Sequence, residues 1–355
     1  MLSLLEADSY TMRLICLFCL VFTLMYSLSP VTAQDTNQHL IPPYIDEATI
    51  VYIDVYINDI LAIDEKMETF DVDGYLLAEW SDPRQVFDAF EFGYDFKIYR
   101  NEMVQDVITD EVWWPDLYLV NAKGNREIIS SLLLISPDGD MRYEEKFKAT
   151  IKQAFQLENF PFDSHQLVLT IGSFSYTDYE VIFTSYKEAE VFEWQTNEWI
   201  VTDSGELNFN SSYGYPVAQY FLGISRLPGF YISKYIFPLV LIITISWSVF
   251  WLGYESIDIA DRLGIILTSV LTVVAFDFVS SETLPRLSYH TILDWIMILS
   301  YVVLSLTVLE TLLGYRNLKH GVEDRANKID LLSRYVFPLV YYVAILSIII
   351  YKVLL

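Results

Sequence analysis

The chain has 355 residues, of which 53% are hydrophobic, and a formal net charge of −25 at neutral pH. The apolar content is high for a soluble protein and indicates membrane spans, whereas the charge requires a part that lies in water with an acidic surface. An acidic chain without a basic patch excludes nucleic acid as a partner. The length provides for about two domains besides a targeting segment.

The N-terminus has the pattern of a secretory signal peptide. A positive charge at Arg13 is followed by an apolar core over 14–28 and by a small-residue cleavage motif that ends at Ala33. A membrane anchor is the alternative, but the short apolar core and the cleavage motif favour a signal peptide. We therefore expect residues 1–33 to be removed on export.

Cysteine and histidine usage limits the chemistry. The two cysteines, Cys16 and Cys19, both lie in the signal segment, so the exported part has no disulfide and no thiol nucleophile. No two of the four histidines have the spacing of metal ligands. We expect no metal, no cofactor and no enzyme activity, since a membrane-anchored hydrolase would also need a nucleophile motif.

Residues 34–226 show apolar and polar positions alternating in short runs between turn signals. This pattern is typical of many short strands and predicts an all-β, immunoglobulin-like sandwich. The clearest runs are 49–57, 74–80, 126–136, 147–155, 166–171 and 218–225.

The composition changes abruptly after residue 226, and residues 227–355 are expected to form a four-helix transmembrane domain. Each of four apolar segments is long enough to cross a bilayer. They cover about 230–252, 257–279, 292–313 and 335–355. A loop of about 20 residues between the third and fourth segments is basic, which places it inside and returns the C-terminus to the outside. Its basic residues are Arg316, Lys319, Arg325, Lys328 and Arg334.

The second apolar segment carries a stripe of residues at steps of three and four, which is one face of a helix. A polar stripe within a membrane needs water, and a ring of such helices around a pore supplies it. Bulky apolar residues on the stripe would close the pore by dewetting. Alternatively, Thr268 bonds only to its own helix. The stripe comprises Gly264, Thr268, Leu271, Ala275, Phe278 and Glu282.

Acidic residues at the two ends of this stripe predict the sign of the ion. Rings of Asp261 at the inner end and Glu282 at the outer end would attract cations. Arg262 opposes this unless its side chain turns away from the pore or pairs with an acid. Asp277 lies about 100° off the stripe, so we expect it at a helix interface with a partner that the sequence does not identify.

Two alternatives to a channel remain at this point. A non-conducting membrane receptor or binding module would have the same sandwich but would not need the polar stripe. A transporter is disfavoured because no inverted repeat or broken helix pair occurs.

Several short motifs occur in a characteristic order ahead of and within the first span. They are Trp80-Ser81-Asp82-Pro83-Arg84, Trp113-Trp114-Pro115-Asp116, Phe160-Pro161-Phe162-Asp163, Arg226-Leu227-Pro228 and Pro238. Together with the four spans, this set resembles the Cys-loop receptor superfamily, the pentameric ligand-gated ion channels. The resemblance implies a homopentamer around a central pore, opened by an extracellular stimulus.

The chain differs from the animal receptors of this family in one way that indicates the prokaryotic branch. Gln153 and Leu167 stand where those receptors have the loop-closing cysteines. The short inner loop and the segments 271–275 and 284–286 are similar to the prokaryotic, ELIC-like branch. This implies a bacterial inner membrane location with the sandwich and the C-terminus outside. It also implies passage of monovalent cations and gating by small primary amines.

The family's ligand site is an aromatic box between subunits, in which ring faces attract an organic cation. By resemblance of the motifs, Trp80 belongs to the face that the neighbouring subunit contributes to the box. The family has a tyrosine at the position of Val120, and in this chain the nearest tyrosine is Tyr118. Ordinary core packing is the alternative for each ring, and for Trp80 the two are evenly balanced. Crowded carboxylates would equally allow gating by protons. The candidate box residues are Trp80, Tyr118, Phe174, Phe209, Tyr213 and Tyr215.

The family joins sensor and pore through a charged interface. An arginine among carboxylates at a domain junction forms bidentate hydrogen bonds, and a shift in this contact would transmit ligand binding to the pore. A static ion cluster is the alternative. By resemblance, the coupling residues are Asp64, Glu65, Pro161, Asp163, Arg226 and Pro285.

Overall fold

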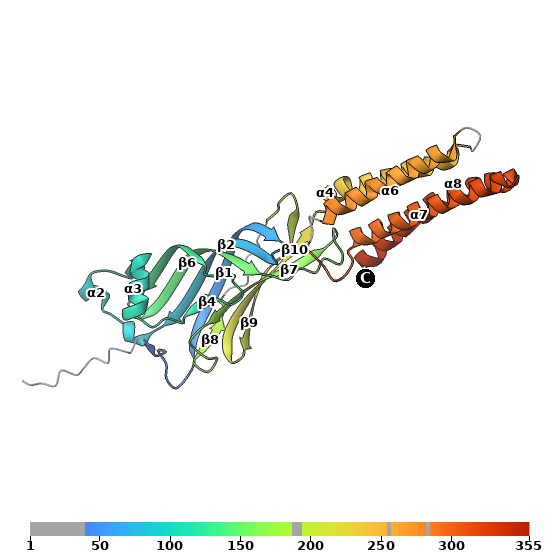
Figure 1. The fold of residues 1–355 in the computed structure, drawn as a ribbon. Helices are drawn as coiled ribbons and strands as arrows, with labels where there is room; N and C mark the ends of the chain where they lie inside the picture. The colour runs from blue at the N-terminus through green and yellow to red at the C-terminus, as the bar shows by residue number, and fades with distance from the viewer. Residues whose placement is uncertain (1–39, 187–193, 254–256, 282–284, 355) are drawn as a thin grey trace, which may run out of the picture.

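The computed structural model of the chain describes residues 40–186, 194–253, 257–281 and 285–354. A β-sandwich occupies one end of the molecule and a bundle of long helices the other, as Figure 1 shows. The predicted signal segment and Glu282 lie outside the described residues.

One layer of the sandwich is a sheet of six strands, in which β1 and β8 pair in parallel and the other neighbours pair antiparallel. Apolar and polar residues alternate along these strands because successive side chains point to opposite faces. In order across the sheet, the strands are β3 (Lys97–Arg100), β5 (Glu127–Ile135), β6 (Asp140–Lys152), β2 (Thr69–Ser81), β1 (Thr49–Asp64) and β8 (Val181–Thr184).

The second layer is an antiparallel sheet of four strands. Its order is β4 (Leu117–Leu119), β7 (Ser164–Ser173), β10 (Tyr215–Arg226) and β9 (Trp199–Ser212). The predicted all-β sandwich is therefore confirmed. Three short helical segments in the β2–β5 connection were not predicted: η2 (Pro83–Gln85), α2 (Ala89–Phe92) and α3 (Glu102–Asp110).

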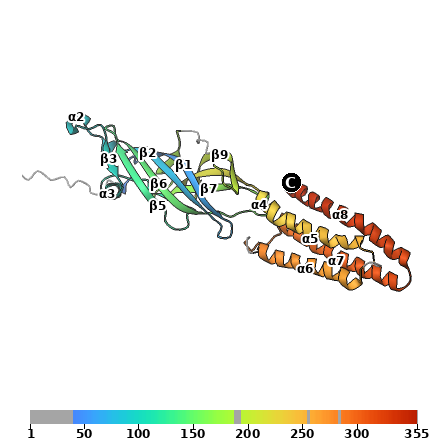
Figure 2. The ribbon, with the colours of Figure 1, turned by 90° about the horizontal axis from the view of Figure 1, so that it is seen from above.

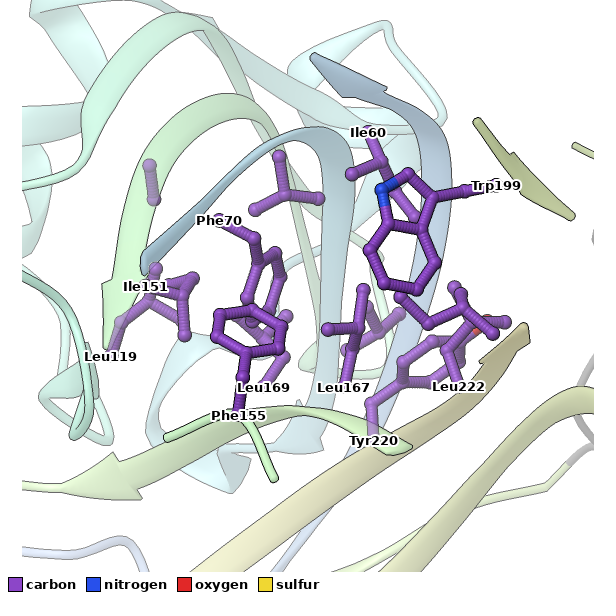
Figure 3. Close-up of a cluster of buried hydrophobic side chains, with 14 of the residues drawn as sticks. Ile60, Phe70, Leu119, Ile151, Phe155, Leu167, Leu169, Trp199, Tyr220 and Leu222 are labelled. Carbon is purple, nitrogen blue, oxygen red and sulfur yellow. The ribbon is translucent and has the colours of Figure 1, made fainter. Parts of the chain in front are cut away.

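Apolar side chains from both sheets fill the space between them (Figure 3). Burial of this apolar surface holds the two sheets together. The cluster in Figure 3 includes Ile60, Phe70, Leu119, Ile151, Phe155, Leu167, Leu169, Trp199, Tyr220 and Leu222.

Within the described residues, four helical segments are long and apolar enough to cross a membrane. The first is assembled from shorter pieces around Pro238, because proline cannot donate the backbone hydrogen bond of a regular helix. Its pieces are α4 (Gly229–Tyr231), η3 (Ile232–Ile236), α5 (Phe237–Trp247) and η4 (Ser248–Trp251). The others are α6 (Ile259–Ser281), α7 (Ile292–Lys319) and α8 (Glu323–Leu354).

The fourth helix begins earlier than the sequence pattern predicted. Helix α7 ends at Lys319 and α8 begins at Glu323, so only residues 320–322 connect them instead of a loop of about 20 residues. Hydropathy finds only the apolar middle of a helix, whereas these helices continue through polar and charged turns. The basic residues assigned to the loop therefore lie on helix ends.

The C-terminus lies at the sandwich end of the bundle in both views (Figures 1 and 2). An ion pair agrees with this placement, since Lys352 Nζ of α8 is 3.7 Å from Glu158 Oε2, in the segment between β6 and β7. The helices thus run alternately away from and toward the sandwich, which is the expected up-and-down topology.

Candidate functional site

The predicted pore stripe lies on the open face of α6. Gly264, Thr268 and Ala275 are exposed in the single subunit, and Leu271 and Phe278 are each 69% exposed. The opposite face of the helix is packed inside the bundle, with Ile266, Ser269 and Val273 buried. The face that the single chain leaves open therefore combines the small and polar residues Gly264 and Thr268 with the bulky apolar residues Leu271 and Phe278.

Thr268 makes the hydrogen bond that was considered as the alternative to a pore role. Its Oγ1 donates to the Gly264 carbonyl at 2.7 Å, and Thr272 Oγ1 donates in the same way to Thr268. The hydroxyl oxygen retains acceptor capacity toward water or an ion. Backbone bonding and a pore-facing position are therefore compatible at Thr268.

Arg262 is fully buried and turns away from the stripe. Its Nη2 donates to Asp330 Oδ2 of α8 at 2.9 Å and to the Val249 carbonyl at 2.9 Å. The neighbouring Asp261 is exposed at the inner end of α6. Pairing with an acid was one of the two outcomes expected for Arg262, but the sequence pattern did not identify Asp330 as its partner.

Asp277 finds its partner on the third span. The Tyr301 hydroxyl of α7 donates to Asp277 Oδ2 at 3.1 Å. This places the carboxylate between α6 and α7, as its offset from the stripe predicted. Tyr301 lies on the next helix, 24 residues along the chain, so no local sequence pattern identifies it as the partner of Asp277.

Two of the predicted box residues form an exposed aromatic pair. The rings of Tyr118 in β4 and Phe174, just after β7, meet edge to face with centroids 5.8 Å apart, and Phe174 is 71% exposed. Gly172 makes room for the pair, because a Cβ there would lie 3.2 Å from the Tyr118 ring and 2.9 Å from Val120. Open ring faces at a subunit surface suit an organic cation.

The predicted capping loop is a tight hairpin between β9 and β10. Tyr213 and Gly214 both have positive φ, 53° and 82°, as a two-residue hairpin turn requires. The tip is fixed to the segment after Phe174, since Asp178 N donates to the Gly214 carbonyl at 3.0 Å and Ser211 Oγ donates to Asp178 Oδ2 at 2.6 Å. Tyr213 is thus displayed at the turn.

The remaining box candidates differ in accessibility. Tyr215 is 41% exposed beside the turn, whereas Phe209 is half-buried and packs on the core. Trp80 is only 3% exposed, and its ring meets Trp113 and Trp114 edge to face inside the sandwich. At Trp80 the structure favours core packing over ligand contact, because its ring is not presented at the surface.

Arg226, the last residue of β10, is buried where the sandwich meets the helices. Its Nε donates to Asp163 Oδ1 at 2.9 Å, its Nη2 to Glu65 Oε1 at 2.6 Å, and its Nη1 to Glu198 Oε1 at 2.5 Å. The guanidinium also lies 4.0 Å from the ring centroid of Trp199. One arginine thus joins strand β10 to three other segments of the sandwich.

The contact with Arg226 keeps the Asp163 carboxylate charged. Burial raises the pKa of Asp163, but hydrogen bonds from His165 and Arg226 outweigh burial and hold that pKa below its ordinary value. His165 Nε2 is 2.6 Å from Asp163 Oδ2. Asp163 and Arg226 therefore form an ionised pair at neutral pH.

The acids that contact Arg226 differ in two ways from those named by the sequence motifs. Asp64 does not reach Arg226; its Oδ1 accepts from Met67 N at 2.8 Å and so stabilises the turn between β1 and β2. Glu198, which the sequence motifs did not include, contacts Arg226 and also accepts from the Tyr231 hydroxyl at 2.8 Å. In the sequence, Glu198 is distinguished only by its position next to Trp199. That position alone does not distinguish it from an ordinary surface acid.

The loop between β6 and β7 contacts the helical bundle directly. The Tyr289 hydroxyl, in the connection between α6 and α7, accepts from Leu157 N at 3.0 Å. Pro161 is buried in the first of these loops, and Pro285 is half-buried in the second. Gln153, at a position where the animal receptors have cysteine, closes the β6–β7 loop differently, since its Oε1 accepts from Val168 N at 3.3 Å.

Among the described residues, no group of three or more acidic, histidine or cysteine side chains has the arrangement of a metal site. The arrangement instead offers an exposed helix stripe, an exposed aromatic pair and a charged junction between them.

Comparison with known proteins adds independent information. A sequence profile described as neurotransmitter-gated ion-channel ligand binding domain matches residues 30–218. A proton-gated ion channel from Gloeobacter violaceus is 25% identical over 333 residues, which are 90% of this chain and 88% of that protein. Gamma-aminobutyric acid receptor subunit gamma-1 from Mus musculus is 25% identical over 294 residues, or 79% of this chain and 61% of the subunit. Subunit epsilon from Rattus norvegicus is 26% identical over 312 residues, 83% of this chain and 59% of the subunit. The chain thus spans about three-fifths of these receptor subunits.

Proposed function

Because the chain belongs to the neurotransmitter-gated ion-channel family, the pentameric ligand-gated channels, we propose that five copies form a cation-selective channel opened from outside. Membership in this family makes the chain a multi-pass membrane receptor with an extracellular sensor domain, and not an enzyme. The same chain carries the Tyr118–Phe174 pair at its four-stranded sheet and the outer surface of its six-stranded sheet. Neighbouring copies in a homopentamer can therefore supply the two faces of a ligand site. We assign residues 34–226 to the sensor, 227–355 to the pore and 1–33 to a cleaved signal peptide.

The observation that carries cation selectivity is the opposite placement of two neighbouring charges on α6. Arg262 is buried against Asp330, and Asp261 is exposed at the inner end of the stripe. Five copies would present a ring of carboxylates to permeating ions while the guanidinium charge stays inside the bundle. Glu282, outside the described residues, is proposed as the matching outer ring.

Charge reversal at Asp261 tests this proposal. We expect Asp261→Lys to move the reversal potential, measured in asymmetric salt, toward the anion equilibrium potential, and Asp261→Asn to move it part of the way. Asp324→Asn is the matched control, because Asp324 is an exposed acid at the same end of the bundle on α8. A cation reversal potential that persists in Asp261→Lys would refute the assigned role.

The stimulus is proposed to be a small ammonium ligand at the Tyr118–Phe174 pair or a rise in external proton concentration. The exposed rings support the ligand, and the likeness to a bacterial proton-gated ion channel supports protons. The bacterial inner membrane location and the prokaryotic, ELIC-like assignment are proposed from the sequence motifs alone. We expect Phe174→Ala to raise the half-maximal amine concentration about tenfold and to leave a proton response unchanged. An unaltered amine response would remove this pair from the site.

A non-conducting receptor with the same sandwich is the second candidate. The observation that disfavours it is the exposure of Gly264, Thr268 and the terminal Asp261 on the open face of α6, since a lipid-facing anchor would gain nothing from small, polar and acidic residues there. Surface-expressed protein that binds ligand without current would favour this alternative.

A further inference from the structure

The short strand β4 carries one ring of the Tyr118–Phe174 pair and lies at the edge of the four-stranded sheet, next to β7. Directly after β4, Val120 N donates to the Thr170 carbonyl of β7 at 2.8 Å. Bonded and non-bonded residues alternate along an antiparallel pair, so the Leu117 carbonyl, three residues earlier, points away from β7. Leu117 is buried, and a buried carbonyl needs a hydrogen-bond donor.

Arg126, just before β5, supplies this donor. Its Nη1 donates to the Leu117 carbonyl at 3.0 Å. The same guanidinium forms an ion pair with Glu145 of β6, since its Nε lies 2.6 Å from Oε1 and its Nη2 donates to Oε2 at 3.2 Å. The Glu145 side chain is fully buried. Through Arg126, an acid of the six-stranded sheet therefore holds the free edge of β4 in the other layer.

A second donor reaches the same carboxylate. The Tyr143 hydroxyl, also on β6, donates to Glu145 Oε2 at 2.6 Å. Burial and the neighbouring carboxylate raise the pKa of Tyr143, so this hydroxyl keeps its proton at neutral pH. The Tyr143 hydroxyl thus contacts the carboxylate, whereas Arg126 contacts both the carboxylate and β4.

The two residues before Leu117 are bonded from the side of β7. Ser173 Oγ donates to the Pro115 carbonyl at 2.8 Å, and Phe174 N donates to the Asp116 carbonyl at 3.0 Å. The next carbonyl along the chain is the one that the guanidinium holds. The backbone beneath one ring of the aromatic pair is therefore bonded to the residue that carries the other ring, and without the guanidinium it would be held from one side only.

We propose that the buried Arg126–Glu145 ion pair positions the Tyr118–Phe174 rings for an organic cation by fixing the backbone of β4. Neither side chain needs to touch the ligand, and the two opposite charges add no net charge to the site. The inference rests on the proposed ligand site and identifies residues that set its geometry.

Replacing both partners separates positioning from stability. Glu145→Leu leaves the guanidinium without its acid and should lower the thermal midpoint, whereas Arg126→Met combined with Glu145→Leu should recover most of that loss. The double variant still has no donor for the Leu117 carbonyl. We therefore expect its half-maximal amine concentration to stay about tenfold above that of the wild type, with an unchanged reversal potential.

Tyr143→Phe is the matched control, because it removes a hydrogen bond to the same carboxylate but keeps the contact of Arg126 with β4. It should keep the amine sensitivity of the wild type. Recovery of both thermal midpoint and amine sensitivity in the double variant would overturn the proposal, because a merely structural ion pair predicts that result.

Amide hydrogen exchange of the full-length protein in detergent tests the position of β4 without any ligand. We expect the Phe174 amide, which donates to the Asp116 carbonyl, to exchange about tenfold faster in the double variant than in the wild type and in Tyr143→Phe. The Arg226 amide, which donates to the Asp163 carbonyl at the far end of the sandwich, is the internal reference. An unchanged rate at Phe174 would overturn the proposal.

Failure of the proposed stimulus has a different signature. A wild type that does not respond to amines would contradict the ammonium ligand, and the Phe174 exchange rate would still decide whether the ion pair holds β4. An amine response that is equal in the wild type and the double variant would contradict only the positioning role.

Discussion

A single guanidinium, that of Arg226, faces Asp163, Glu65 and Glu198 at the junction. Arginine suits this position because its planar group presents five donors in a fixed geometry, which a lysine ammonium does not. The ring of Trp199 covers the guanidinium and limits access of water. The junction therefore depends on one residue more than on any of its acidic partners.

We expect Arg226→Ala to abolish gating and to reduce stability by about 3–5 kcal/mol, because it leaves the buried Asp163 carboxylate without its arginine partner. Arg226→Lys should retain surface expression but lose most of the evoked current. Arg100→Ala, an exposed arginine in β3, is the control. Full currents in Arg226→Ala, measured with surface expression, would contradict a coupling role.

The lowered pKa of Asp163 predicts how the junction responds to acid. A carboxylate with a depressed pKa in the folded state contributes stability above its unfolded value of about 4, and this is lost as pH falls through the folded pKa. The stability difference between the wild type and Asp163→Asn should therefore be constant from neutral pH down to about 4 and shrink below it. Thermal unfolding across pH measures this. A difference that shrinks well above that pH would place Asp163 among the proton sensors.

At the scale of elements, α6 is fixed to α8 by the buried pair of Arg262 and Asp330. The pair orients the pore helix, because it holds one face of α6 against the bundle and leaves the stripe open. This contact explains why an arginine next to Asp261 is compatible with a cation pore.

Replacing only one partner of the Arg262–Asp330 pair should reduce the free energy of unfolding more than replacing both partners. We expect Asp330→Leu to reduce the free energy of unfolding by about 3–5 kcal/mol, and the double variant Arg262→Met with Asp330→Leu to recover most of the loss. The cation reversal potential should persist in the double variant. Equal destabilisation of the single and double variants would show that the pair itself does not determine the packing.

The strands were predictable because half-buried strands alternate, as β6 does from Met141 to Ala149. The short helices α2 and α3 were not, since they lack the length for a periodic signal. The start of α8 was misplaced because its first turns are charged. Contacts such as Arg262 with Asp330, Asp277 with Tyr301 and Arg226 with Glu198 join distant segments, and local patterns carry no information about them.

At the scale of the whole molecule, the loop between β6 and β7 contacts the helical bundle at two places. Leu157 N donates to the Tyr289 hydroxyl, and Glu158 next to it pairs with Lys352 near the C-terminus. The segment 157–158 therefore contacts both the connection after the pore helix and the last helix. Movement of this segment would reach two parts of the bundle at once.

Removing the Tyr289 hydroxyl should weaken this link without disturbing the fold. We expect Tyr289→Phe to raise the half-maximal stimulus by roughly threefold to tenfold, as for one lost hydrogen bond. Tyr315→Phe, at a half-exposed position on α7, is the control. An unchanged concentration response in Tyr289→Phe would exclude this bond from gating.

Current through a membrane that contains this chain alone, recorded in asymmetric salt while external pH is stepped and small primary amines are applied, is the most direct test of a stimulus-opened cation channel. The proposed function predicts a current evoked by one of these stimuli that reverses near the cation equilibrium potential. An evoked current that reverses near the anion potential, or surface-expressed protein that stays silent under both stimuli, would contradict it.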